Sequence, residues 1–506
     1  MTADSDYVGG VDPVADDSAV VPDGLVVAVA AVLVGSVAAV LVGSVVAVGS
    51  ASSGTRIAAG VTVAAVLVGV LRYPFAQMRG RRTGPVIVLI SVGLIGSALS
   101  LRAEAGLAAG LIGPFTGPAR VVDDPRPYRS ATWVIIDIDG SRHEIWARSN
   151  SDRRRVASLR AGEWVVVSGE REPLDPDRAR RVAWQHVIGS FRVDWLGDVT
   201  SGGPLARASN RVRSLVADGA ALIGEPDDSL LRGLVIGDDL DQPPEMIERF
   251  RRSGLSHLTA VSGQNVTLVL AAGAPLLRRL GSRTRLVTTV ALIAWFVAIT
   301  RFEPSILRAG TMAVLATVGT HLGRERTPMR MLALALSLLV VIDPLITRSV
   351  GLWLSVGATA GVVGLGPRLA EGLGRFGVLA TPVGITLGAQ LGVALPSVLT
   401  FGRLPLVGLV ANLLAVPVAG AVMLLGLPAC LIAGALGGIS PDLGWLALAP
   451  VALGVRWVDQ ISIIGDRIEP ESSVYGIVVT LAVGVAALYR FEWRRRRGVP
   501  EMAGVL

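Results

Sequence analysis

Long runs of apolar residues dominate the pattern of hydrophobic and polar positions along this chain. Three runs lie at roughly 25–49, 57–71 and 85–101, and apolar sequence continues almost unbroken from about 254 to 458. A helix that crosses a bilayer needs about 20 mostly apolar residues, so the pattern predicts a polytopic α-helical membrane protein with about 10–13 spans. Beyond the first three, we expect spans at 255–277, 285–300, 305–322, 331–347, 349–366, 377–395, 404–421, 423–438, 443–458 and 474–490.

The polar interval between the third and fourth apolar runs has the alternation of β-structure. ATWVIIDIDGSRHEIWARS (131–149) alternates apolar and polar residues around Asp139-Gly140, which is a strong hairpin signal. GEWVVVSGERE (162–172) predicts a further strand. Short strands at this spacing indicate a small all-β barrel, and an OB-like fold fits them. We therefore predict a helical bundle with an inserted small all-β OB-like external domain.

These patterns divide the chain into six parts. Clusters of arginine mark cytoplasmic segments, and the basic run RFEWRRRR (490–497) predicts a cytoplasmic C-terminus, with the β domain on the outer side of the cell membrane. The expected parts are an acidic disordered tail (1–23), N-terminal transmembrane helices (24–103), the β domain (104–203), an amphipathic interfacial helix and linker (204–232), the main transmembrane domain (233–470), and a final transmembrane helix with a basic tail (471–506).

Composition supports the membrane assignment and excludes several kinds of site. The 506 residues are 51% hydrophobic and only 17% charged, whereas a soluble domain is about 25% charged. The net charge of +7 is weak support for an anionic substrate. Cys430 is the single cysteine and there are four histidines, so a disulfide framework or a His-rich zinc hydrolase cannot be built. No Walker A sequence is present, and we expect no cofactor and no metal.

The most polar segment inside the apolar region is RSGLSHLTAVSGQNVTL (252–268). Polar groups at bilayer depth are costly, so they tend to face a cavity, a partner helix or a substrate path. On a helix His257, Val261 and Asn265 share one face, and Gly263 is expected to loosen or break that helix. We favour a hydrophilic path lined by His257, Ser262, Gly263, Gln264 and Asn265.

Two other readings of this segment remain open. Its polar side chains are also compatible with a structural contact between helices. A hydrolase with Ser262 as nucleophile and His257 as base is the weakest reading, because no third orienting group or oxyanion hole is recognisable.

A second candidate for the path is TRFEPSILRAGTM (300–312), which contributes Arg301, Glu303 and Arg308. Arg301 and Glu303 are also compatible with an interfacial ion pair. Arg308 lies about one turn inside a span, so it needs either a partner or an aqueous cavity. An arginine facing a pore would attract phosphate, whereas pairing with Glu303 or Asp343 is the alternative.

Two further polar groups favour a structural role. Ser355, in DPLITRSVGLWLSVGATAGVV (343–363), is expected at a close helix–helix contact. The carboxylates Asp238, Asp239 and Asp241 have the composition of a cation site, but a loop that caps the following helix is favoured.

The β domain is rich in arginine and tryptophan. Cations beside stacking rings are typical of surfaces that bind single-stranded nucleic acid, although a solvated surface over core tryptophans is the simpler alternative. The candidate external DNA contacts are Arg153, Arg154, Arg155, Trp164, Arg180 and Arg181.

The order of these motifs resembles ComEC-type competence proteins. GDDLDQPPEMIERFRRSGLSHLTAVSGQNV (237–266) is similar to the family's central signature, and the interval 131–174 resembles its OB-like external domain. Three more segments follow in the family's order: EPSILRAGTMA (303–313), DPLITRSVGLWLSVGATAGVVGLGP (343–367) and LPSVLTFGRLPLVGLVANLLAVPVAG (395–420). The likeness extends over about residues 100–470.

The resemblance implies a function and a set of partners. Such proteins form the inner-membrane channel through which single-stranded DNA enters the cytoplasm during natural transformation. The family positions carried over are His257, Ser262, Gly263, Asn265 and Arg308. Expected partners are single-stranded DNA, membrane lipid, a separate DNA receptor and a cytoplasmic ATPase, with a homo-oligomer as a further option.

This chain departs from the family pattern in two places. Many relatives have histidine where this chain has Asn265, which weakens any proton or metal role there. Many also carry a C-terminal metallo-β-lactamase-like domain, whereas this chain ends at Leu506 without one, so a separate nuclease is expected. The alternative function is transport of another anionic or lipid-linked solute on the same scaffold.

Overall fold

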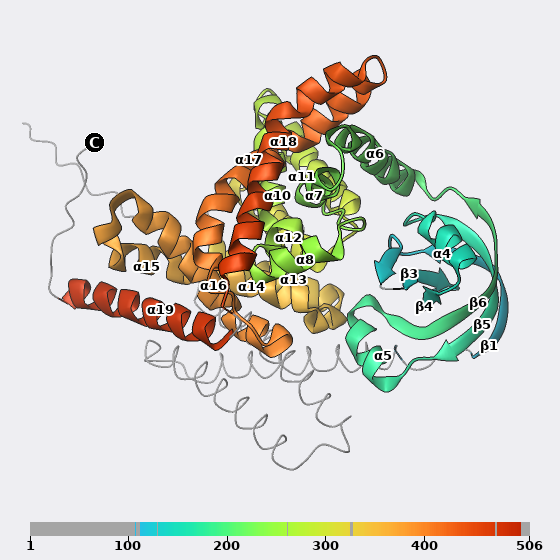
Figure 1. Cartoon of the computed structure of the whole chain (residues 1–506), viewed down its shortest axis with the longest axis horizontal. Helices are drawn as coiled ribbons and strands as arrows, with labels where there is room; N and C mark the ends of the chain where they lie inside the picture. Colours follow the sequence, from blue (N-terminus) through green and yellow to red (C-terminus); the bar gives the residue numbers. More distant parts are fainter. Residues whose placement is uncertain are drawn as a thin grey trace, which may run out of the picture.

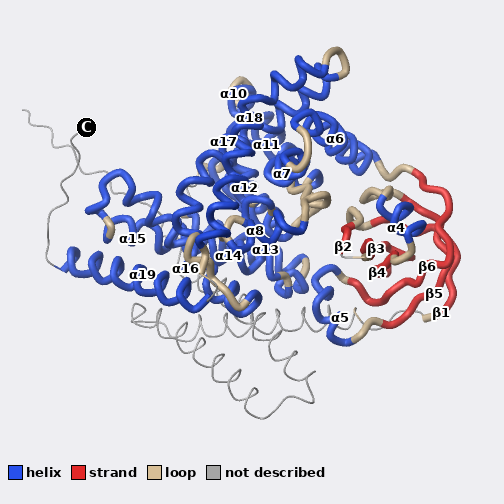
Figure 2. The backbone as a smooth tube through the Cα atoms, in the orientation of Figure 1, coloured by secondary structure: helices blue, strands red, loops and turns tan. Residues whose placement is uncertain are grey.

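The computed structural model describes residues 107, 112–128, 130–260, 262–323, 327–470 and 473–496. The predicted acidic tail, the three N-terminal spans and the end of the basic tail lie outside these residues. The described chain forms a small β domain beside a larger helical bundle (Figures 1 and 2). This arrangement confirms a polytopic helical protein with a small β domain.

The β domain is a sheet that closes on itself. Strand β1 pairs with both β5 and β3, giving the cyclic order β1–β5–β6–β4–β3, and the short β2 is added on β3. Only the β4–β6 pair is parallel among these strands. This is the Greek-key order of an OB-like barrel. The strands are β1 (Gly113–Val121), β2 (Arg126–Tyr128), β3 (Ala131–Ile138), β4 (Ser141–Ala147), β5 (Trp164–Pro173) and β6 (Val187–Thr200).

Local sequence explains both the barrel core and its hairpin. The alternating residues Val134, Ile136 and Ile138 of β3 are buried in the barrel core. The β3–β4 turn needs positive φ at both central residues, and Asp139 and Gly140 adopt 52° and 82°. The pattern of side chains thus sets which face of each strand points inward.

Helices α4 and α5 belong to the β domain, and the bundle contains long membrane-type helices and several short helices. The helices are α4 (Asn150–Ala157), α5 (Pro176–Val182), α6 (Pro204–Ala220), α7 (Asp227–Ile236), α8 (Pro244–Arg252), α9 (Ser256–Thr259), α10 (Gly263–Leu277), α11 (Ser282–Ile299), α12 (Pro304–His321), α13 (Pro328–Ile342), α14 (Val350–Ala360), α15 (Gly366–Gly372), α16 (Ala380–Phe401), α17 (Gly408–Gly437), α18 (Pro441–Ile468) and α19 (Ser473–Arg496). The short turns are η1 (Ala183–Gln185), η2 (Ala221–Ile223), η3 (Pro344–Arg348), η4 (Gly361–Leu365) and η5 (Gly374–Leu379).

Five helical segments of the described chain are long and apolar enough to cross a membrane, and two shorter apolar helices, α10 and α13, accompany them. The chain is therefore a membrane protein. The five segments are Ser282–Ile299, Val350–Gly372, Gly374–Phe401, Gly408–Gly437 and Pro441–Ile468.

The separation of 404–421 and 423–438 into two spans is wrong. Both lie in α17, one helix of 30 residues that continues through Pro417 and Pro428. A proline in a membrane helix is tolerated where neighbouring helices pack against the freed backbone. Helices α18, α6 and α7 pack along α17, and its buried Ala415, Ala419 and Gly426 allow close approach.

Helix α6 joins the β domain to the bundle and is itself packed into the bundle. It crosses α17 so closely that a Cβ at Gly219 would lie 2.1 Å from the Cys430 carbonyl oxygen. Its Arg213 side chain is buried, although Arg207 and Arg211 are exposed. One face of this amphipathic helix therefore packs against the bundle, and the opposite face is exposed.

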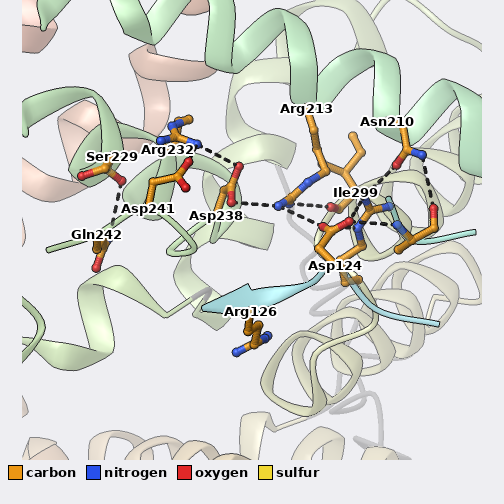
Figure 3. Close-up of polar contacts among 12 residues, drawn as sticks. Asp124, Arg126, Asn210, Arg213, Ser229, Arg232, Asp238, Asp241, Gln242 and Ile299 are labelled. Carbon is orange, nitrogen blue, oxygen red and sulfur yellow. Dashed lines mark hydrogen bonds and ion pairs between the residues drawn. The ribbon is translucent and has the colours of Figure 1, made fainter. Parts of the chain in front are cut away.

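A buried ion-pair cluster fixes the β domain on the bundle (Figure 3). Asp124, from the β1–β2 loop, accepts hydrogen bonds from Arg301 at 2.8 and 2.9 Å and pairs with Arg213 at 3.3 Å. Burial alone would raise the pKa of Asp124, but the guanidinium groups of Arg213 and Arg301 outweigh it and hold the pKa below its usual value. One carboxylate thus connects three segments of the chain.

Two further contacts complete this junction. Arg126, on β2, pairs with Glu303 at 3.0 Å, and His186, from the β5–β6 connection, lies 2.9 Å from Asp343. The loops that follow β1 and β5 both face the bundle. In OB-folds these are the loops that border the ligand-binding face.

We expect Asp124→Asn to loosen the β domain, because it leaves two buried guanidinium groups without their shared carboxylate. Breaking a buried ion pair by removing one partner costs about 3–5 kcal/mol. The apparent melting temperature in detergent should fall, and limited proteolysis should separate the β domain faster than in wild type.

Asp139→Asn removes the same charge from an exposed turn and should behave like wild type. Because the pKa of Asp124 is depressed in the folded protein, its stabilisation is present at neutral pH and is lost only as the pH falls through that lowered pKa. Equal stability of the two variants would contradict the role of Asp124.

Candidate functional site

The central polar segment is broken into two helices. Helix α9 ends at Thr259, and α10 begins at Gly263 with Ser262 as its N-terminal flanking residue. The expected break at Gly263 is confirmed. The expectation that His257 and Asn265 share one helix face is wrong, because the backbone is extended at Ala260 and Ser262 between them.

Asn265 anchors this segment to the core. Its amide donates to the Leu234 carbonyl of α7 at 3.0 Å, and its side-chain oxygen accepts the Ser262 hydroxyl at 3.0 Å. The amide nitrogen and the oxygen of the Asn265 side chain thus both form hydrogen bonds, and Asn265 orients the Ser262 hydroxyl. A nucleophile activated by His257 would need a different partner for Ser262.

His257 and Gln264 are exposed although they lie beside buried residues. Leu255 and Leu258 are 0% and 2% exposed and fix the short helix α9 in the main core. The Gln264 amide lies over Gly420 of α17, where a Cβ would approach its nitrogen to 3.0 Å. Neither side chain is buried by the described chain.

Arg308 is buried in the bundle without a carboxylate partner among the described residues. Its Nε donates to the Ser355 hydroxyl at 2.9 Å and its Nη1 to the Thr359 hydroxyl at 2.7 Å. Its Nη2 faces Gly263, where a Cβ would approach to 2.8 Å. The central segment and Arg308, far apart in sequence, thus meet at one place.

Glycines position the two hydroxyls that hold Arg308. Helix α14 and the π-turn η4 cross α16 so tightly that a Cβ at Gly357 or Gly361 would strike the α16 backbone, at 2.4 and 2.0 Å. π-Turns within helices are frequent at functional sites. Sequence analysis assigned Ser355 to packing, whereas the structure gives it an additional role as an acceptor for Arg308.

The other residues of the second cluster lie at the domain junction. Arg301 binds Asp124 and Asn210, Glu303 binds Arg126, and Asp343 binds His186. Neither Glu303 nor Asp343 is therefore the partner of Arg308. The pair expected between Arg301 and Glu303 is replaced by pairs that each residue makes with the β domain.

The acidic loop before α8 pairs with arginines and does not cap that helix. Asp238 pairs with Arg213 at 3.1 Å and with Arg232 at 3.5 Å, and Asp241 pairs with Arg232 at 2.9 Å (Figure 3). Pro243 precedes α8 and makes no side-chain cap, so the favoured capping interpretation is wrong. Three or more potential metal ligands gather nowhere within the described ranges.

The candidate DNA contacts of the β domain lie on three separate elements. Arg153, Arg154 and Arg155 lie on α4, Arg180 and Arg181 on α5, and Trp164 on β5. Trp164 is 43% exposed, which contradicts a buried core position for this ring.

An aromatic group that the sequence patterns did not predict lies on the face formed by β2, β3 and β4. Trp133 and Trp146 lie opposite each other, Tyr128 meets Trp146 edge to face at 5.6 Å, and the Arg178 guanidinium lies over both indoles. Glu144 holds Arg178 at 2.7 Å. The pairing of two tryptophans across one hairpin was readable from the register around Asp139, but the cation over them was not.

Replacing Arg308 with methionine should stabilise the protein. The change removes a buried charge that no carboxylate of the described chain compensates, and it keeps the side-chain volume. Apolar replacement of buried charges stabilises by about 1–4 kcal/mol in other proteins. We expect a higher apparent melting temperature in detergent.

Arg213→Met is the matched control, because the same substitution then leaves Asp124 and Asp238 without a shared buried partner. Its melting temperature should fall. A fall in both variants would mean that Arg308 is needed for folding, and it would contradict the view of Arg308 as an uncompensated charge.

Comparison with known proteins shows the family to which the chain belongs. A family model described as Competence protein matches residues 234–496, more than half of the chain. Competence protein ComA of Neisseria gonorrhoeae is 28% identical over 315 residues, which cover 57% of this chain and 40% of that protein. The uncharacterized protein YcaI of Escherichia coli (strain K12) is 26% identical over 207 residues, covering 38% of this chain and 27% of that protein.

The chain therefore spans less than half the length of these two relatives. No solved structure matches it. The matched range includes the helix break at Gly263, Arg308 and the hydroxyls of Ser355 and Thr359, whereas the β domain and α6 precede it. The family model and the motif order agree, and the chain belongs to the competence protein family, of the ComEC type.

Proposed function

We propose that this protein is the plasma-membrane channel that imports single-stranded DNA during natural transformation in a bacterium. The observation that carries the proposal is Arg308, a buried guanidinium held by the hydroxyls of Ser355 and Thr359. A buried charge is costly unless something compensates it. A passing phosphate would supply the missing negative charge.

The surroundings of Arg308 suit a polyanion better than a tightly bound solute. Single-stranded DNA carries one negative charge per nucleotide, so its path must be wet and must hold each phosphate only weakly. The Nη2 of Arg308 lies against Gly263, and the residues on either side of Gly263, Ser262 and Gln264, are neutral and polar. One cation among neutral donors would attract phosphates without trapping them.

In this proposal the β domain receives the DNA strand on the outer side of the membrane. Its β1–β2 and β5–β6 loops face the bundle through the pairs of Arg126 with Glu303 and His186 with Asp343. We assign this domain to the outer side of the membrane and the C-terminus to the cytoplasm. Arginines of α4 and α5 and the ring of Trp164 are the external DNA contacts in this proposal.

Other proteins would deliver the DNA to this channel and drive its transport. A DNA receptor would deliver the strand, and a cytoplasmic ATPase would supply the energy. Membrane lipid surrounds the bundle, and assembly of several copies is compatible with the proposal.

Uptake of fluorescent DNA into the cytoplasm tests this function in a demonstrably transformable host. Deletion should abolish uptake, and wild-type protein should restore it. Arg308→Met should lower uptake about tenfold or more, because one charge-assisted contact is worth about 1.5–3 kcal/mol. Its abundance in the membrane, measured by blot, should equal or exceed that of wild type.

His257→Ala tests the helix break in the same assay, and its uptake should also fall at normal abundance. Asp139→Asn is the control and should import DNA like wild type. Unchanged uptake in the deletion strain would refute DNA import and would favour transport of another anionic or lipid-linked solute.

A further inference from the structure

A pocket of about 330 Å³ lies where the β domain meets α6, away from the helix break. The loop before β5 contributes Arg160 and Glu163, the connection between β6 and α6 contributes Ser201 and Gly202, and α6 contributes the remainder. Pockets of this size take a small group and not a folded partner. The residues from α6 are Arg207, Asn210, Arg211 and Ser214.

The pocket is positively charged. Arg160, Arg207 and Arg211 are exposed, and within the part of the chain that the structure describes none of them forms an ion pair with a carboxylate. The nearby Glu163 carboxylate instead accepts the Arg160 backbone N–H at 2.7 Å. Three cations therefore converge on a small hollow with one carboxylate, which is already engaged.

The walls of the pocket are fixed. Gly162 has a φ of +86°, and a Cβ there would lie 2.4 Å from the Cβ of Ala206 on α6. Asn210 donates to the Ala161 carbonyl at 3.2 Å and accepts from Arg301 at 2.6 Å. The positions of Arg207, Arg211 and Ser214 then follow from α6 itself, because residues three and four apart share one helix face.

The ligand class follows from the charge and the neighbouring rings. Arginine binds the oxygens of phosphate with its planar set of donors. Trp164 follows Glu163 and pairs with Thr200, next to the pocket residue Ser201, and its ring is exposed. Cations that track the backbone beside an exposed ring are the combination that binds single-stranded nucleic acid.

We propose that this pocket binds a phosphodiester group of single-stranded DNA where the strand passes from the β domain to the helical bundle. The inference rests on the proposed function and adds a contact that neither the central segment nor Arg308 supplies. It also assigns a binding role to the exposed face of α6, whereas Arg213 on the opposite face forms ion pairs at the domain junction.

The test uses the full chain in nanodiscs of neutral phosphatidylcholine and measures the anisotropy of a labelled oligo(dT) at several salt concentrations. The double variant Arg207→Gln, Arg211→Gln should bind about tenfold more weakly at low salt. The slope of log K against log salt should lose about 0.7 for each phosphate contact removed. Arg207→Lys with Arg211→Lys keeps both charges but loses the planar donors, so it should keep the wild-type salt slope while binding more weakly than wild type and more tightly than the glutamine variant.

The matched control is Arg283→Gln with Arg285→Gln, which removes two exposed arginines from the start of another helix, α11. It should bind like wild type, and all variants should keep the wild-type melting temperature. Equal oligo(dT) binding by wild type and the Arg207, Arg211 double variant would overturn the pocket while leaving the proposed function in place. Absence of binding by wild type would overturn both.

A second arm distinguishes DNA from lipid as the source of the phosphate. Native mass spectrometry counts the phosphatidylglycerol molecules retained by wild type and by the Arg207→Gln, Arg211→Gln variant. Equal retention together with weaker oligo(dT) binding supports the proposal. Loss of phosphatidylglycerol with unchanged oligo(dT) binding would make this a lipid-headgroup site and would overturn it.

Discussion

The arrangement of this protein depends on one carboxylate shared by two buried guanidinium groups. Asp124 belongs to the β domain, Arg213 to α6 and Arg301 to the turn between α11 and α12. Ion pairs taken out of water are stable only when every charge is matched and hydrogen-bonded. Because Asp124 of the β domain is the group that both arginines contact, the pairing sets where the β domain lies against the bundle.

Because other arginines of the bundle pair with carboxylates, the lack of such a partner for Arg308 among the described residues is informative. Arg213 and Arg232 are buried beside carboxylates, and the partly buried Arg301 pairs with Asp124, so their charges contribute to the fold. Arg308 is equally buried, yet hydroxyls and a thioether hold it. Neutral acceptors satisfy its hydrogen bonds but leave its charge uncompensated. In the function proposed here, the phosphates of a passing DNA strand would supply the compensating negative charge.

The sequence predicted those features that depend on local pattern. Apolar run lengths gave the membrane helices, alternation around Asp139-Gly140 gave the hairpin, and Gly263 gave the helix break. It did not predict pairings over long separations, such as Arg301 with Asp124, 177 residues apart, or Arg308 with Ser355, 47 apart. It also divided α17 into two spans, because single-sequence patterns do not include the neighbouring helices that keep α17 continuous through Pro417 and Pro428.

Helix α7 connects the domain junction with the central segment. Arg232 lies in the ion-pair cluster through Asp238, and two residues later the Leu234 carbonyl accepts the amide of Asn265. Every residue of α7 from Ser229 to Ile236 is buried, so this helix cannot rearrange at one end without displacing the other. The β-domain loops are therefore held in fixed register with Ser262 and Gly263. A strand guided by those loops would meet the helix break, and the uncompensated charge of Arg308 beside it, at a position that the junction determines.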